Sequence, residues 1–191
     1  MISVFTPTHD SSFLSMVYQS LSRQTYNDWE WVVVYNNGGK VLEFNDPRVR
    51  TIVLNNMPKW VGPLKAHACE QSRGDILVEL DHDDLLMPTA LQEVAKAFED
   101  KEVGFVFSNS IHATGDFKKI KRFDERYGWR YREVNVDGNI LDEHITFDPC
   151  PSGISRIWYA PNHLRAFRKS VYESVGGFAK DMRILDDLDL M

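Results

Sequence analysis

Short apolar runs alternate with longer amphipathic segments over the first 108 residues of the chain. The runs are rich in Val, Ile, Leu and aromatic residues and are too short for helices, so they predict buried strands. They lie at residues 2–7, 29–35, 49–54, 76–80 and 103–107. Segments with helical spacing of apolar residues lie at 13–21, 62–72 and 89–98. This alternation predicts an α/β fold, with a mostly parallel sheet covered by helices on both faces.

Two of these helices carry more detailed signals. Phe13, Val17 and Leu21 fall on one helical face, which we expect to be buried. Thr89 precedes the third helix and Gln92 follows three residues later, which is the spacing of a capping box. In that motif the threonine hydroxyl bonds a backbone N–H of the first turn, and the glutamine side chain returns to the threonine N–H.

The pattern changes after residue 108. Residues 111–123 are compatible with a hairpin that turns at 114–116, and residues 124–158 are polar and aromatic without a clear period. A strand is expected at 162–168, followed by a short helix at 169–175. The acidic stretch that ends at Met191 has no closing element, so we expect the chain to be truncated at its C-terminus.

Composition limits the classes of protein that fit. The 191 residues are 43% hydrophobic, which suits one core, and the net charge of −6 argues against a nucleic-acid binder. The two cysteines do not make a disulfide framework, so a reducing, cytoplasmic location is expected. We expect no transmembrane segment and no signal peptide, because no apolar run approaches about 20 residues and Met1 leads directly into a strand.

The run at residues 76–80 ends abruptly in three acids packed around one histidine: Asp81, His82, Asp83 and Asp84. The carboxyl ends of strands are where open α/β sheets bind ligands. Crowded carboxylates repel one another, and a hard cation such as Mg²⁺ or Mn²⁺ relieves the repulsion. Such a metal takes phosphate oxygens to complete its shell, so a metal-bound phosphate ester is expected here. The alternative is a structural cluster of acids at a helix N-terminus.

Four motifs, in their order and spacing, resemble the family 2 inverting glycosyltransferases, which have the GT-A fold. Residues 3–10 resemble the opening strand and nucleotide-contacting turn, and residues 80–84 resemble the DxD motif. Residues 176–178 and 186–190 are similar to the GGF and (E/D)DxDL signatures. The resemblance covers essentially the whole chain. It implies a Rossmann-like, three-layer GT-A domain over 1–191.

In such a domain, residues 1–108 would bind the nucleotide sugar and residues 109–191 the acceptor. The resemblance implies a Mn²⁺ or Mg²⁺ cofactor with Asp83 as direct ligand, and Asp81 nearer the ribose or bound to the metal through water. Lys65 stands where the family has an arginine near the phosphates, so it keeps the charge without the bidentate geometry.

The resemblance also assigns the remaining donor residues. Pro7, Thr8, Asp10, Asn36 and His82 are candidates for the nucleoside pocket. Thr8 and Asp10 have a second interpretation, as caps of the first helix. Asn36 occupies a position where the family has an acid, so the choice of nucleotide stays open, with a UDP-sugar favoured.

Catalysis is assigned to the end of the chain. Asp187 is the candidate general base, which would take the proton of the acceptor hydroxyl as that oxygen attacks the anomeric carbon and inverts it. Asp186, His163 and Trp158 are candidates for the acceptor side. The acceptor would be a hydroxyl of a glycan, a lipid or a protein-linked sugar, with peripheral membrane association left open.

Three other functions are alternatives to this one. One alternative is a sugar-nucleotide-binding module without catalysis, as part of a longer chain. It fits the absence of the acids that the family has after the second strand. A nucleotidyltransferase shares the sheet and the metal acids but has a glycine-rich, basic loop after its first strand. A dinucleotide oxidoreductase is disfavoured because no G-x-G-x-x-G follows that strand.

Overall fold

A computed structural model describes residues 1–36, 40–55, 60–147, 150, 162–181 and 190. Contacts between residues divide the chain into two compact units. The first comprises Met1–Val106 with Arg165–Met191, and the second comprises Phe107–Leu164.

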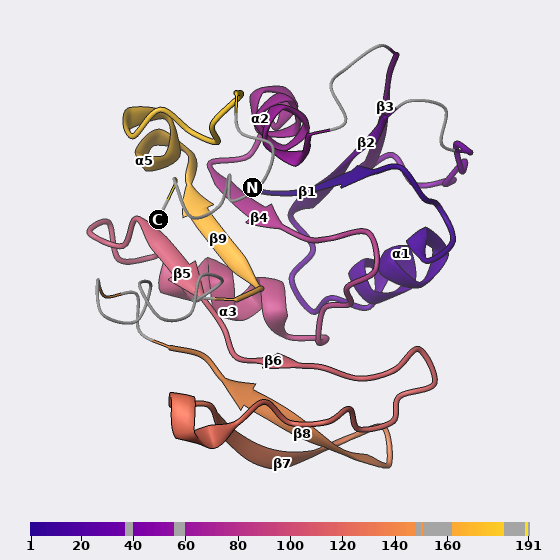
Figure 1. The fold of residues 1–191 in the computed structure, drawn as a ribbon. Helices are drawn as coiled ribbons and strands as arrows, with labels where there is room; N and C mark the ends of the chain where they lie inside the picture. The colour runs from indigo at the N-terminus through magenta and orange to yellow at the C-terminus, as the bar shows by residue number, and fades with distance from the viewer. Residues whose placement is uncertain (37–39, 56–59, 148–149, 151–161, 182–189, 191) are drawn as a thin grey trace. The chain divides into compact units, whose positions relative to one another are not determined.

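A six-stranded sheet in the order β3-β2-β1-β4-β9-β5 forms the centre of the first unit (Figure 1). Its strands are β1 (Ile2–Thr8), β2 (Trp29–Asn36), β3 (Val49–Leu54), β4 (Ile76–Glu79), β5 (Phe105–Phe107) and β9 (Arg165–Arg168). The pairs β1–β2, β1–β4 and β2–β3 are parallel, and β4–β9 is antiparallel. The mostly parallel sheet predicted from the apolar runs is therefore confirmed.

Helices cover both faces of this sheet (Figure 1). They are α1 (Leu14–Ser22), α2 (Val61–Gln71), α3 (Ala90–Ala97) and α5 (Lys169–Ser174). One core cluster joins α2 and α5 to the face that carries Phe5 and Phe167. On the other face, Tyr18 of α1 stacks on Trp31 of β2 with ring centroids 6.4 Å apart. Burial on both faces explains why the central strands are continuously apolar.

Two of the local predictions are wrong. Phe13 is 43% exposed, because α1 begins one residue later and buries Leu14 in its place. The capping box does not form at α3. Thr89 occupies the N-cap position but its backbone is not extended, and its side chain makes no capping bond. Gln92 instead accepts a hydrogen bond from the Thr25 hydroxyl at 2.8 Å.

The second unit is a small antiparallel sheet in the order β6-β8-β7. Its elements are β6 (Ser110–Ile111), β7 (Arg130–Val136), β8 (Asn139–Ile145) and the 3-10 helix η1 (Glu125–Tyr127). The β7–β8 hairpin lies in the stretch to which the sequence analysis assigned no pattern. Its turn consists of Asp137 and Gly138, both with positive φ, which is the geometry favoured in tight hairpins. The turn predicted at 114–116 is present, since the Phe117 N–H donates to the Thr114 carbonyl.

His144 of β8 lies inside an aromatic cluster of the second unit. Its side chain is 3% exposed, and its ring centroid lies 4.2 Å from that of Trp129. Neither ring nitrogen has a hydrogen-bond partner within the described part of the chain. Burial, with a smaller effect of the neighbouring His112, lowers the pKa of His144 from 6.5 to about 4. The folded protein therefore holds this imidazole neutral.

This burial predicts a loss of stability in acid. Between the unfolded pKa of His144 and its folded pKa of about 4, the unfolded chain binds more protons than the folded one. The stabilisation is therefore fully present when the pH is above the pKa of His144 in the unfolded chain. It decreases as the pH falls toward the pKa of His144 in the folded protein. From pH 7 to pH 5 we expect the second unit to lose about 2 kcal/mol through this group.

Hydrogen exchange of the β7 and β8 amides at the two pH values, corrected for intrinsic rates, measures that loss. The variant His144→Phe keeps an aromatic ring and cannot titrate, so its hairpin should lose correspondingly less protection. Equal losses in the wild-type chain and the variant would contradict the assignment.

Candidate donor-binding site

The acid turn follows directly from the end of β4, at the carboxyl edge of the parallel strands (Figure 1). The Leu80 N–H donates to the Phe5 carbonyl at 3.2 Å, and the Thr6 hydroxyl donates to the Leu80 carbonyl at 2.7 Å. Beyond this anchor the Asp84 N–H donates to the Asp81 carbonyl at 3.2 Å and closes the turn. The backbone that carries the acids is thus fixed to the central strand β1.

Exposure differs among the acids of this turn. Asp81 and His82 are half-buried, whereas Asp83 and Asp84 are exposed. A carboxylate that solvent reaches can exchange water for a metal ion or a phosphate without a large desolvation cost. The exposed acids therefore have the accessibility that a ligand-binding role requires.

The loop after β1 lies beside the acid turn. The rings of His9 and His82 meet edge to face, with centroids 5.2 Å apart. The Thr8 hydroxyl donates to the Asp10 carbonyl at 2.5 Å, and Asp10 Oδ1 accepts from the N–H and hydroxyl of Ser12 at 2.9 and 2.6 Å. The Ser12 hydrogen bonds lower the pKa of Asp10, which is therefore an anion at neutral pH.

These bonds bear on the two interpretations of Thr8 and Asp10. The N-cap residue of α1 is Phe13, which makes no side-chain capping bond. Asp10 binds its own loop and leaves the first turn of the helix uncapped by its carboxylate. The loop is thus a structured edge at the end of β1, with Thr8 buried and Asp10 exposed.

Asn36 lies at the carboxyl end of β2, the neighbour of β1 in the sheet. It is the last residue of β2 and is 5% exposed, and its neighbour Tyr35 pairs with Thr8 in the parallel β1–β2 ladder. Pro7, Thr8 and Asn36 therefore lie along the same edge of the sheet as the acid turn. The structure brings these predicted donor residues together within the first unit.

Lys65 of α2 lies in a buried ionic cluster. Its Nζ is 2.6 Å from Oε1 of Glu79, and Nε of Arg165 is 3.0 Å from Oε2 of the same carboxylate. Glu79 is wholly buried, and both cationic side chains are less than one-tenth exposed. A charge cluster of this kind is costly to bury, and removing one of its members is strongly destabilising because it leaves the others uncompensated.

Sequence reasoning missed Glu79 and Arg165. The signal was a charged residue within the apolar run of β4, two positions before Asp81, where a buried strand otherwise has no place for a carboxylate. Arg165 occupies the register position opposite Glu79 on β9, a pairing that no local pattern reveals.

Several predicted residues are not placed by the structure. Asp186, Asp187 and Trp158 lie outside the described residues. His163 is half-buried in the second unit, where its backbone N–H donates a hydrogen bond to the side-chain oxygen of Asn162 at 2.8 Å. Their assignment to catalysis and to the acceptor stays a prediction.

A divalent metal fits the chemistry of the acid turn. Asp83 and Asp84 offer exposed carboxylate oxygens, which are the donors that Mg²⁺ and Mn²⁺ prefer. The adjacent imidazole of His82 packs against His9 and is not required as a ligand.

The family model for glycosyl transferase family 2 matches residues 3–176. The chain belongs to this family. The resemblance suggested by the four motifs is therefore confirmed. An uncharacterised protein of Mycobacterium tuberculosis is 26% identical over 194 residues, which cover 99% of this chain and 60% of that protein. The chain thus spans less than two thirds of the length of that relative.

Solved structures show the same fold. TarS 1–349 of S. aureus, in complex with UDP-GlcNAc, superposes with a TM-score of 0.64 at 16% identity, over 99% of this chain and 52% of that chain. The mannosyltransferase PcManGT of Pyrobaculum calidifontis, in complex with GDP-Man and Mn²⁺, gives 0.58 at 18% identity, over 98% and 50%. The GT-A fold is confirmed by these neighbours. Among the described helices, each is too short or too polar to span a bilayer.

The burial of Glu79 predicts that two Glu→Gln substitutions differ strongly in their effect on the free energy of unfolding. Glu79→Gln leaves the ammonium of Lys65 and the guanidinium of Arg165 in the core without this anion, so we expect a cost of about 3–5 kcal/mol in the free energy of unfolding. Glu70→Gln breaks an exposed pair with Lys180, whose side chains are 51% and 67% exposed, and should cost less than about 1 kcal/mol. Urea unfolding measures both, and equal effects would contradict the role of Glu79.

Proposed function

We propose that this chain is a metal-dependent, inverting glycosyltransferase that uses a nucleoside-diphosphate sugar, with a UDP-sugar favoured. The acceptor is a hydroxyl of a glycan, a lipid or a protein-linked sugar. The observation that carries the proposal is the acid turn at the end of β4, fixed to β1 in a family 2 chain. The bound UDP-GlcNAc of TarS and the Mn²⁺ of PcManGT support the donor class and the metal.

Asp83 is the proposed metal ligand, with Asp81 nearer the ribose or bound to the metal through water. When bound, the Mn²⁺ or Mg²⁺ supplies positive charge that stabilises the leaving diphosphate. Lys65 adds a second positive charge near the diphosphate. Because its ammonium is already paired with Glu79, we propose that it contributes through the local field.

The nucleoside is proposed to lie along the edge formed by the strand ends. Pro7, Thr8 and Asn36 shape the floor of this pocket, since all three are buried at the ends of β1 and β2. Asp10 and His82 flank it, the first as an exposed anion able to accept hydrogen bonds from ribose hydroxyls or a base N–H. An asparagine at position 36 offers both a donor and an acceptor, so it suits a base edge that presents both.

Asp187 is proposed as the general base. It would accept the proton of the acceptor hydroxyl while that oxygen attacks the anomeric carbon opposite the diphosphate, which inverts the configuration. Asp186 and Asp189 are acidic neighbours of Asp187 in the sequence, and carboxylates held close together would disfavour its charged form and make it a better base. Asp186, His163 and Trp158 are proposed to contact the acceptor. A cytoplasmic location, with the enzyme at a membrane surface or free of it, completes the proposal.

Substituting the proposed metal ligand tests the donor site. Asp83→Asn removes one charged oxygen from the turn, and we expect turnover of the donor to fall at least about a hundredfold. Mn²⁺ should also no longer raise the melting temperature with UDP present, since a ligand that binds only the folded state stabilises it. Asp75→Asn, an exposed acid beside the chain N-terminus, is the matched control and should behave as wild type. Full activity of Asp83→Asn with Mn²⁺ would refute the metal assignment.

Substituting the proposed base separates donor binding from chemistry. For Asp187→Asn we expect the donor Kd, measured by calorimetry, to stay within about a factor of three, while transfer falls by about 10²–10⁴. An unchanged transfer rate would remove Asp187 as the base. A wild-type chain that binds donor yet neither transfers nor hydrolyses it would support the binding-module alternative.

A further inference from the structure

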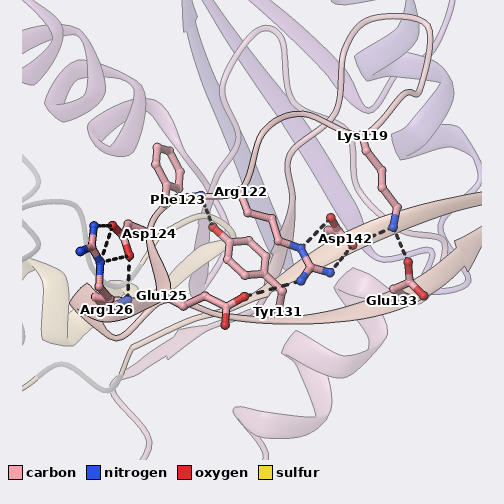
Figure 2. Close-up of polar contacts among 9 residues, drawn as sticks. All are labelled: Lys119, Arg122, Phe123, Asp124, Glu125, Arg126, Tyr131, Glu133 and Asp142. Atoms are coloured by element: carbon pink, nitrogen blue, oxygen red, sulfur yellow. Dashed lines mark hydrogen bonds and ion pairs between the residues drawn. The ribbon is translucent and has the colours of Figure 1, made fainter.

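A small, shallow recess, open to solvent, lies in the second unit beside the β7–β8 hairpin. Residues 120–123 form one wall, and Tyr131 of β7 with Asp142 and His144 of β8 form the other. Figure 2 shows Arg122, Phe123, Tyr131 and Asp142 of this group, with the polar contacts that join them. None of these residues is used by the donor site.

The polar side of the recess is a planar ion pair. Arg122 donates from Nε and from a terminal nitrogen to the two carboxylate oxygens of Asp142, both at 2.9 Å. Lys119 approaches the same carboxylate at 3.0 Å (Figure 2). These cations hold the pKa of Asp142 far below its usual value, so the pair stays ionised. A guanidinium has five N–H donors, of which two bond Asp142. The other terminal nitrogen lies 3.6 Å from a Glu125 oxygen, which is an ion pair but too long for a hydrogen bond, so donors remain for a ligand.

The apolar side of the recess is exposed. Ile120 is 39% exposed and Phe123 is 43% exposed, although both are large apolar side chains. The Phe123 ring packs on Trp129 with centroids 4.8 Å apart, and the Phe123 N–H donates to the Tyr131 hydroxyl at 2.9 Å (Figure 2). The ring is therefore held in place while part of its surface remains open to solvent. A fixed aromatic ring beside fixed polar groups binds ligands with little loss of conformational entropy.

His144 contributes an unmet hydrogen-bonding demand. It lines the recess, is buried, and lacks a partner for either ring nitrogen among the residues that the structure describes. Buried polar groups are nearly always satisfied by protein, water or ligand. Both nitrogens are inaccessible to solvent, so a water or a ligand hydroxyl reaches them only if the ring moves.

Charge around the recess is balanced. Lys119 and Arg122 are paired with Glu133 and Asp142, in contacts drawn in Figure 2. Lys121 also lines the recess, and Glu125 lies 3.6 Å from Arg122, so three acids offset three cations. Tyr131, His112 and His144 are the other titratable groups that line it. A paired surface of this kind favours a neutral ligand rich in hydroxyl groups over a small anion.

We propose that one sugar ring of a glycan binds across the opening of this shallow recess, stacked on the exposed Phe123 side chain. A pyranose has an apolar face of C–H groups and a rim of hydroxyls, which match the Phe123 ring and the Arg122–Asp142 pair respectively. The assignment of that glycan as the acceptor rests on the proposed function. An enzyme that extends a glycan gains affinity by holding sugars beyond the one it modifies.

The test measures binding by the whole chain without donor or metal. Maltotriose, cellotriose and triacetylchitotriose are titrated at millimolar concentrations while NMR follows the Trp129 indole N–H and the Arg122 Nε–H. At least one trisaccharide should shift both signals with a saturable, millimolar Kd. Phe123→Leu keeps the apolar volume but removes the flat ring, and it should weaken binding about tenfold, which is about 1.4 kcal/mol.

Phe117→Leu is the matched control. Phe117 is a 40% exposed phenylalanine of the same unit that does not line the recess, so this variant should bind as wild type. Absence of saturable shifts with all three sugars, equal weakening by both variants, or a response of these signals to inorganic phosphate alone would overturn the proposal. A chain that binds sugar here but transfers none would contradict the proposed function and leave the subsite intact.

Discussion

The position of the acid turn depends on the wholly buried carboxylate of Glu79. It ties β4 to α2 through Lys65 and to β9 through Arg165. Two residues later the chain reaches Asp81, so the direction in which β4 ends sets the direction of the acid turn. Burying three ionic groups together costs desolvation energy, which their mutual attraction offsets only while all three remain in contact. The acid turn is thus carried by a strand end with little freedom to shift.

Strand β9 runs antiparallel to β4 and lies between β4 and β5 in the sheet. It returns from beyond the second unit to pair with β4, with Arg165 opposite Glu79 and Arg168 opposite Ile76. The sheet therefore joins the N-terminal part of the chain to residues far along the sequence, beside the strand that bears the acids. The second unit, between β5 and β9, is an insertion between two neighbours in one sheet. Its recess is consequently built from a continuous stretch of chain.

The elements predicted correctly are those whose signal is local. β1 and β2 are buried runs of β-branched and aromatic residues, and β3 is a run of β-branched residues that alternates between half-buried and exposed positions at its end. The bounds of all three agree with the predictions to within a residue. The β7–β8 hairpin was missed because its strands mix apolar residues with charged ones that pair across the sheet, such as Arg132 with Glu143. The Asp137–Gly138 turn was the available signal, since that dipeptide favours a tight hairpin. The role of Glu79 was missed because its partners are distant in sequence.

The central claim is that a divalent ion at the acid turn holds the diphosphate of a sugar nucleotide. Anomalous diffraction from crystals of the chain grown with Mn²⁺ and UDP measures this most directly, because manganese scatters anomalously where protein and nucleotide oxygens do not. The account predicts a strong anomalous peak bonded to a carboxylate oxygen of Asp83 and to phosphate oxygens of UDP. A nucleotide bound elsewhere, or bound at this edge with the manganese held away from Asp81 and Asp83, would contradict it.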